Sequence, residues 1–385
     1  MIYPLTSSVL EKDDVNSAIK VIKSKKITMG KETKNFENSF SKKITKSYSM
    51  MVNSGSSANL LIFQCLINPK VKRLKKGDEV LIPAICWSTS LWPIVQSGLK
   101  VKFVDINLKD LNIDINDLKK KITRKTKALM LVHALGNCAN MNKIVSICKK
   151  KKLILVEDAC EALGSKFKGK NLGTFGDFSS FSFYYSHHIT SGEGGMICTK
   201  SKKYANVIKT LRSHGWSREI SNKKKNNWIF INSGFNLRPT DISAAIGLSQ
   251  LNKLNKIINI RKRNFKLIRN SLLAENKYLD KFDIIKESKF NSIAWFGVPI
   301  ILKSKKKNYK YTVTKKLNKK GIDTRPLISG NFANQPAVKL YNLNVNKKLK
   351  NADLIDKNSF FIGLHNKKIS YREINYIKKA LYASL

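Results

Sequence analysis

Short apolar runs alternate with helical stretches over the first two thirds of the chain. Six runs rich in apolar, β-branched and aromatic residues are predicted strands: 80–84, 101–104, 128–133, 153–157, 178–183 and 195–199. Residues 144–152 and 202–213 have helical spacing and contain good helix formers. Because this alternation is typical of parallel strands joined by helices that cover the sheet, it predicts an α/β domain around a mostly parallel sheet.

A long helix is predicted to follow, with Thr240 or Asp241 as its N-cap. Its apolar positions are Ile242, Ile246, Leu251, Leu254 and Ile258. The rest of the chain mixes strand-like and helical pieces, such as 295–302 and 309–319, without an internal repeat or a Pro/Gly/Ser linker. We therefore expect two closely packed domains. These are a large α/β domain, residues 1–245, and a smaller α+β domain, residues 246–385.

The chain is strongly basic, with 73 Lys and Arg against 26 Asp and Glu and a formal net charge of +47. These residues are spread over the whole sequence in short groups rather than gathered in one segment. A dedicated nucleic-acid face is the alternative interpretation, but no zinc-finger spacing, basic zipper or aromatic RNA-binding motif accompanies the charge. We expect a solvated basic surface that attracts anionic nucleotide ligands, and no nucleic-acid partner.

The cysteine pattern argues against a metal centre. The six cysteines are widely separated: Cys65, Cys86, Cys138, Cys148, Cys160 and Cys198. Their spacing matches neither zinc nor iron–sulfur ligand patterns, so we expect no metal and a reducing compartment. Residues 1–9 lack the features of a signal peptide, and no window approaches the roughly 20 apolar residues that span a bilayer. We therefore expect a soluble, cytoplasmic protein without a membrane partner.

Two segments have the residue types of an anion and ring-binding site. Residues 53–59, Asn-Ser-Gly-Ser-Ser-Ala-Asn, form a predicted turn into a helix, whose free N–H groups suit a phosphate. A serine-rich helix cap is the alternative. Asp158 directly follows the strand predicted at 153–157, at the edge where open α/β sheets bind ligands. For this residue the alternative is a helix N-cap.

A third segment, 177–195, contains the pair His187 and His188 in a loop rich in Gly and Ser after a predicted strand. A lone histidine is more often structural than catalytic. Two adjacent histidines in such a loop favour a catalytic role, because imidazole titrates near neutral pH and can move protons.

Taken together, these three segments resemble the DegT/DnrJ/EryC1/StrS family of sugar aminotransferases, a branch of the fold-type I pyridoxal-phosphate enzymes. The resemblance continues through 211–215, 234–238 and 241–251, in the same order along the chain. It implies an aspartate aminotransferase-like fold, with a three-layer α/β/α large domain and a smaller α+β domain. It also implies pyridoxal 5′-phosphate and pyridoxamine 5′-phosphate as cofactors.

The resemblance assigns cofactor contacts to particular residues. Ser56, Ser57 and Ser182 are expected to hold the cofactor phosphate. Trp87 is expected to stack on the cofactor ring, although a core tryptophan is the alternative. Asp158 is expected to pair with the ring nitrogen and keep the ring protonated.

Two further assignments concern the ring hydroxyl and the neighbouring subunit. Glu161 stands where the family usually has Gln facing the ring hydroxyl, which is a departure from the pattern. Asn236 is expected to reach the phosphate of the neighbouring subunit, which implies a homodimer with composite active sites. The candidate substrate-binding residues are His188, His214, Arg218, Arg325 and Asn331.

His187 is the main departure, because ordinary family members have a Schiff-base lysine at this position. Imidazole cannot form that bond but can act as an acid and base. The relatives with a His-His pair are 3-dehydratases of 4-keto-6-deoxy nucleotide sugars, and residues 324–332 and 360–365 resemble that subgroup. The resemblance therefore implies removal of the sugar C3 hydroxyl, with His187 as the catalytic residue and glutamate as amino donor.

Two alternatives remain within the family. A conventional aminotransferase would need another lysine near the cofactor, and none occurs between Lys170 and Lys200. A CDP-sugar dehydratase of the ascarylose type carries a cysteine-rich insert, whereas residues 216–233 contain no cysteine. GDP-4-keto-6-deoxymannose, as in colitose synthesis, is therefore the substrate that we expect.

Overall fold

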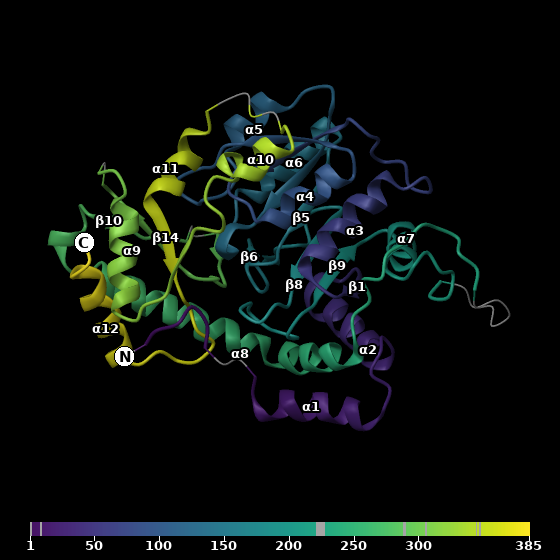
Figure 1. The fold of residues 1–385 in the computed structure, drawn as a ribbon, viewed down its shortest axis with the longest axis horizontal. Helices are drawn as coiled ribbons and strands as arrows, with labels where there is room; N and C mark the ends of the chain where they lie inside the picture. Colours follow the sequence, from purple (N-terminus) through teal and green to yellow (C-terminus); the bar gives the residue numbers. More distant parts are fainter. Residues whose placement is uncertain are drawn as a thin grey trace.

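A seven-stranded sheet with the strand order β1-β9-β8-β5-β4-β2-β3 forms the centre of the molecule (Figure 1). The computed structural model describes residues 2–7, 10–220, 228–287, 290–304, 306–343, 345 and 348–385. The strands are β1 (Tyr48–Val52), β2 (Glu79–Pro83), β3 (Lys100–Val104), β4 (Thr126–Val132), β5 (Ile154–Asp158), β8 (Phe178–Ser182) and β9 (Gly195–Thr199). Strands β3, β2, β4, β5 and β8 are parallel, and β9 is antiparallel to β8 and β1. Every residue of β5, β8 and β9 is buried, as expected for strands covered on both faces.

The chain reverses its direction across the sheet at β3. Helix α4 (Ser88–Gln96) leads from β2 to its neighbour β3, and the chain then returns through α5 (Ile115–Lys121) to β4 and through α6 (Met141–Lys151) to β5. Because such crossovers are right-handed, the reversal places α4 on one face and α5 and α6 on the other. The carboxyl ends of the strands beside this reversal are where open α/β sheets bind ligands.

Helix α3 (Gly55–Ile67) brings a second element to this edge. Its N-cap is Ser54, whose side chain accepts the N–H of Ser57. The helix packs against α4, against α7 (Lys202–Arg212), and against β8 and β9. The free N–H groups of its first turn therefore lie on the same edge as the carboxyl end of β8.

The C-terminal part forms a smaller unit around the antiparallel sheet β10-β12-β14-β13, at the opposite end of the molecule from α7 (Figure 1). Its strands and helices are β10 (Phe282–Asp283), β12 (Val298–Leu302), β13 (Thr324–Pro326), β14 (Ser359–Ile362), α9 (Tyr309–Lys319), α10 (Pro336–Leu340), α11 (Lys350–Asn358) and α12 (Tyr371–Tyr382). The 32-residue helix α8 (Asp241–Leu272) runs from the large sheet to this unit. The domain boundary expected at 245/246 falls inside α8 and stays a proposal.

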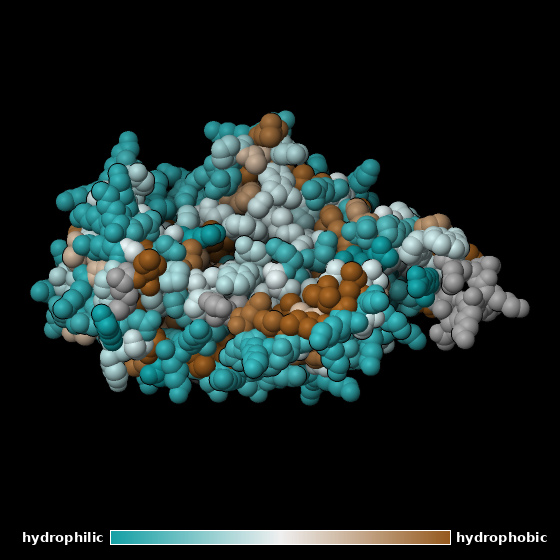
Figure 2. Space-filling view, turned by 60° about the horizontal axis from the view of Figure 1, so that its bottom comes forward, coloured by the Kyte–Doolittle hydropathy of each residue, from teal (hydrophilic) through white to brown (hydrophobic). Residues whose placement is uncertain are grey.

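The N-terminal helices α1 (Lys12–Lys23) and α2 (Lys31–Phe40) pack along α8. Figure 2 shows a band of hydrophobic side chains across the otherwise largely hydrophilic face that includes α1. Val15, Ile19 and Ile22 on α1 are exposed and lie on one side of the helix. The remaining short elements are η1 (Ser41–Thr45), η2 (Ala134–Gly136), η3 (Asn276–Tyr278), η4 (Phe332–Asn334), β6 (Lys166–Phe167), β7 (Lys170–Asn171) and β11 (Asn291–Ser292).

The structure confirms the predicted α/β class and all six predicted strands of the large sheet, and it adds β1, which we did not predict. It also confirms the long helix capped by Thr240, whose side chain accepts the N–H of Ser243. Within the part of the chain that the structure describes, no helix is long and apolar enough to cross a membrane. Among the same residues, no group of three or more His, Cys, Asp or Glu side chains is placed to hold a metal ion.

Candidate active site

Asp158 ends β5 at the carboxyl edge of the sheet and is the most completely hydrogen-bonded group of the site. Its Oδ2 accepts from Asn59 Nδ2 at 2.9 Å and from Ser90 Oγ at 2.7 Å, and its Oδ1 accepts the N–H of Cys160 at 3.1 Å. The side chain is buried, with 5% exposure. Three donors from α3, α4 and the following loop thus hold a carboxylate in one orientation, which suits a ligand group with a protonated ring nitrogen.

Ser182 and the N-terminus of α3 lie in contact at the end of β8. A Cβ atom added at Gly55 would come within 2.7 Å of Ser182 Cβ, so only glycine allows this approach. Ser57 and Ser182 are both 8% exposed. Ser56 Oγ donates to Thr89 Oγ1 at 2.8 Å. Hydroxyl groups and free helix N–H groups thus come together in a cradle that fits a phosphate.

His187 lies in the loop after β8, where its ring is partly buried. The ring centroid is 5.1 Å from that of Phe296 and 6.3 Å from that of Tyr184. The pKa of His187 is lowered to about 4, mainly by burial; the negative charge of Asp158 opposes this lowering, and the positive charge of Arg261 adds to it. Its buried Nδ1 has no hydrogen-bond partner among the residues that the structure describes. The imidazole is therefore neutral at pH 7 and able to accept a proton.

His188 is directed into the protein instead. Its side chain is fully buried, and Nε2 lies 2.6 Å from the carbonyl oxygen of Ala294. Its own carbonyl accepts from Asn366 Nδ2 at 3.2 Å. We propose that His188 anchors the loop, in place of the substrate contact that we expected from the motif.

Glu161 lies beside Asp158 in the loop after β5. Its Oε2 accepts the N–H of Leu135 at 2.8 Å, and burial together with the nearby Asp158 charge raises its pKa to about 8, against the effect of the Leu135 N–H. A neutral carboxyl group at pH 7 has a donor and an acceptor, as the amide of Gln has. The departure from the family pattern therefore preserves the hydrogen-bonding capacity of the position.

Trp87 precedes α4 at the end of β2 and is 55% exposed, so it is not a core residue. Ser90, in the first turn of the helix that follows Trp87, donates to Asp158, so Trp87 lies near the same edge of the sheet.

Of the remaining predicted residues, Arg325 lies in β13 and the others lie outside the long helices and strands. The ring centroid of His214 lies 5.1 Å from that of Trp216, with the two rings tilted. Asn236 is exposed, and its Oδ1 accepts from Arg238 Nε at 3.1 Å. Arg218 and Arg325 are exposed. Asn331 is buried, its Nδ2 donating to Asp353 at 2.8 Å and its Oδ1 accepting the N–H of Ala333 at 3.1 Å. Within the described residues, none of these side-chain hydrogen bonds reaches Asp158, Ser182 or His187.

Three residues that hold the site were not predicted. Asn59 and Ser90 orient Asp158, and Arg261, on α8, acts electrostatically on His187. Each is distant in sequence from the residue that it affects. The only available signal was for Asn59, because it lies in the first turn of the predicted helix that follows the Ser-Gly-Ser-Ser turn.

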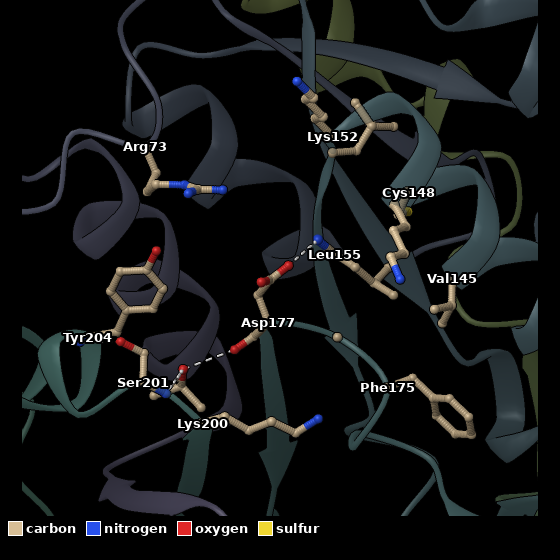
Figure 3. Close-up of a pocket in the computed structure, with 14 residues that line it drawn as sticks. Arg73, Val145, Cys148, Lys152, Leu155, Phe175, Asp177, Lys200, Ser201 and Tyr204 are labelled. Atoms are coloured by element: carbon tan, nitrogen blue, oxygen red, sulfur yellow. Dashed lines mark hydrogen bonds between the residues drawn. The ribbon is translucent and has the colours of Figure 1, made fainter.

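A separate cavity of about 580 Å³ lies at the other ends of the strands (Figure 3). It is lined by Leu155 near the start of β5 and by Asp177 just before β8, whereas Asp158 and Ser182 end those strands. Asp177 points toward the Leu155 N–H, which it accepts at 2.9 Å. None of the predicted site residues lines this cavity, so it is distinct from the candidate active site.

A mixed α/β sheet that carries a fixed carboxylate beside a serine-lined helix N-terminus defines a pyridoxal-phosphate enzyme of the aminotransferase fold. The chain belongs to the DegT/DnrJ/EryC1/StrS aminotransferase family, whose model matches residues 8–381. It is 38% identical to a GDP-4-keto-6-deoxy-D-mannose 3-dehydratase from Escherichia coli O55:H7, over 98% of this chain and 99% of that protein. It is 37% identical to the protein of the same name from Yersinia pseudotuberculosis, over 96% and 95%.

Solved structures agree with this relationship. A crystal structure of GDP-4-keto-6-deoxymannose-3-dehydratase with a trapped PLP-glutamate geminal diamine covers 98% of this chain and 100% of its own, at 37% identity and a TM-score of 0.92. The aminotransferase fold predicted from the sequence is thereby confirmed.

Proposed function

We propose that the chain is a pyridoxal-phosphate-dependent 3-dehydratase of GDP-4-keto-6-deoxy-D-mannose that uses glutamate as amino donor. The observation that carries this proposal is His187, a neutral imidazole where the family has its lysine, in the same site as the fixed carboxylate of Asp158. The names of the similar proteins support the GDP sugar, and the PLP-glutamate complex of one of them supports glutamate.

The residues of the site fit the cofactor. We assign its phosphate to Ser56, Ser57 and Ser182, and its ring nitrogen to Asp158. Trp87 would stack on the ring. When bound, the cofactor supplies an amine for the sugar ketone and a protonated ring that accepts electrons. Because three donors fix the carboxyl group of Asp158, it would face the ring nitrogen in one orientation and favour the protonated form of that nitrogen.

His187 moves the protons in this proposal. As a neutral base it would accept a proton at the C4′ carbon of the cofactor, and as the resulting imidazolium it would return that proton to the sugar C3 hydroxyl, which leaves as water. The lowered pKa of the partly buried ring means that the base form predominates at pH 7. Glu161, protonated at that pH, donates to the ring hydroxyl. The products are a 4-keto-3,6-dideoxy sugar, ammonia and 2-oxoglutarate.

We also propose that the active form is a homodimer with composite sites. An aromatic group lies next to the segment of Asn236, where the ring of Trp216 is 5.3 Å from Trp228 and 5.9 Å from Phe230. Trp228 and Phe230 are 75% and 57% exposed. Large exposed aromatic side chains are typical of protein interfaces, and a second copy would cover them here and bring Asn236 to the neighbouring phosphate.

We assign the substrate contacts to His214, Arg218 and Arg325. The two exposed arginines are suited to the diphosphate of a nucleotide sugar. Asn331 is already hydrogen-bonded within its loop, so we assign it to the wall of the site. The cytoplasm stays our proposed location, since all six cysteines are free, as expected in a reducing compartment.

A product analysis tests the activity. Purified protein is incubated with pyridoxal phosphate, glutamate and GDP-4-keto-6-deoxymannose, and the sugar is examined by mass spectrometry. We expect a product that lacks one oxygen atom, together with equal amounts of ammonia and 2-oxoglutarate. An amino sugar that keeps its C3 oxygen would indicate a conventional aminotransferase, and a preference for the matched CDP sugar would indicate the other dehydratase type.

A further inference from the structure

Arg261 is a buried cation on α8 whose hydrogen bonds all go to neutral groups. Its Nε donates to the carbonyl of Trp295 at 2.9 Å, its Nη2 to the carbonyl of Phe296 at 2.7 Å, and its Nη1 to Asn366 Oδ1 at 2.8 Å. The side chain is 2% exposed, and no carboxylate among the described residues forms an ion pair with it. A buried charge without a counter-ion destabilises the fold, so a function is the better explanation for it.

Two of these acceptors connect Arg261 to the histidine loop. The ring of Phe296, whose carbonyl Arg261 binds, lies 5.1 Å from the ring of His187 and 6.2 Å from that of His188. Asn366, bound by the guanidinium through Oδ1, donates through Nδ2 to the carbonyl of His188. The planar guanidinium thus binds both the segment packed on the ring of His187 and Asn366, the side chain that donates to the carbonyl of His188.

We propose that Arg261 is a positioning residue for the dehydration, which fixes Phe296 and Asn366 against the loop so that the His187 ring keeps its orientation toward the cofactor. This inference rests on the proposed function, because it takes His187 as the base.

The charge of Arg261 contributes as well. It lowers the pKa of both His187 and His188, in each case as an addition to the larger effect of burial. The charged or titratable groups that face His187 are Asp158 at the end of β5, Tyr184 and His188 on its own loop, and Arg261 on α8. Only Asp158 opposes the lowering. Arg261 therefore helps to keep His187 in its basic form, despite the neighbouring carboxylate.

Three variants separate position from charge. Arg261→Lys keeps the charge and loses the fork. Arg261→Gln loses the charge. Asn366→Ala removes the acceptor of Arg261 Nη1 but leaves the buried charge in place. Lys256→Gln, an exposed site on the same helix, is the matched control. The ring of His187 is titrated by NMR in cofactor-loaded protein with labelled histidine, and its signal is assigned by its absence in His187→Asn.

In Arg261→Gln we expect the pKa of His187 to rise toward the ordinary value near 6.5, and the acid limb of kcat to move to higher pH. In Arg261→Lys and Asn366→Ala we expect the acid limb of the kcat–pH profile to stay at the parental pH. We expect kcat itself to fall by about 10–100-fold, because the His187 ring is displaced. Lys256→Gln is expected to match the parent.

A folded Arg261→Gln protein with parental pKa and parental kcat would overturn the inference. If Arg261→Gln does not fold, parental kcat in both other variants overturns it. The NMR titration needs no substrate. A protein that shows the expected shift but does not dehydrate the GDP sugar would therefore count against the proposed function and leave the electrostatic link of Arg261 to His187 supported.

Discussion

At the scale of single residues, His187 carries the most direct test. His187→Lys restores the usual lysine, which can bind the cofactor covalently and trap it, whereas His187→Asn only removes the base. We expect both variants to lose C3 dehydration by ~10²–10⁴-fold. Only the lysine variant should retain the cofactor on this loop after borohydride reduction and peptide mapping. Dehydration at the parental rate in either variant would show that another group is the base.

Glu161 makes a prediction about pH. Its carboxyl group has a pKa raised to about 8 by burial, so it is neutral below that pH and ionises above it. An ionised Glu161 loses its donor and places a second negative charge near Asp158. The parent should therefore lose kcat/KM as pH rises through about 8, whereas Glu161→Gln should keep it. Identical alkaline limbs in the two proteins would show that the ionisation of Glu161 does not limit the reaction.

The site could be predicted from the sequence where its residues lie in short local motifs. Asp158 stands out because it directly follows a predicted strand, and the turn at 53–59 stands out because it leads into a predicted helix. The roles assigned to Ser57 and Ser182 come from the family resemblance and stay predictions. Asn59, Ser90 and Arg261 were missed, since their roles depend on contacts between elements far apart in the chain. For His188, the sequence carries no signal that its ring turns inward to Ala294 while its neighbour faces the site.

At the scale of elements, the apolar runs predicted the central strands because these are buried on both faces. Strand β1 was missed, as Tyr48-Ser49-Met50-Met51-Val52 mixes residues of high and low strand preference. The two-residue strands β10 and β11 are too short to show the alternation of apolar and polar residues that marks a strand. These strands form because they pair with neighbouring strands, and a local sequence pattern does not reveal such pairing.

Glu157 links β5 to the turn that leads into β8. It is fully buried and accepts from His133 Nε2 at 2.9 Å and from the N–H groups of Gly173, Phe175 and Gly176 at 2.9, 2.7 and 2.7 Å. These bonds hold its pKa below the ordinary value, although burial alone would raise it. The turn 173–176 is thereby fixed in front of the strand that carries Ser182.

We expect Glu157→Gln to lower the free energy of unfolding by about 2–4 kcal/mol at pH 7, because an amide cannot accept all four donors. A depressed carboxyl pKa contributes stability that is present above the unfolded value and lost as pH falls through the folded one. The free energies of unfolding of parent and variant, measured in urea, should therefore become more similar as the pH is lowered below 4.5, the ordinary pKa of a Glu carboxyl group. A small difference between the two free energies of unfolding at pH 7 would show that the four hydrogen bonds contribute little to stability.

At the scale of the whole molecule, the proposed composite sites can be tested by mixing subunits. If Asn236 acts on the phosphate held by Ser182 of the partner, a dimer of one Asn236→Ala subunit and one Ser182→Ala subunit has one site with both defects and one with neither. Random exchange makes half of the dimers mixed, so about a quarter of all sites should be intact although neither variant is active alone. Activity and cofactor absorbance after mixing measure this recovery.

The matched control mixes Ser57→Ala with Ser182→Ala. These residues lie in one subunit, where Ser54 and Gly55 bring the start of α3 to the end of β8. Every site of that mixed dimer keeps one defect, and no recovery is expected. Exchange is verified independently by mass spectrometry of differently tagged subunits. If mixed dimers form and the Asn236→Ala pair recovers no more than the serine pair, then Asn236 serves its own subunit. In that case the exposed aromatic group at Trp228 and Phe230 would need another explanation.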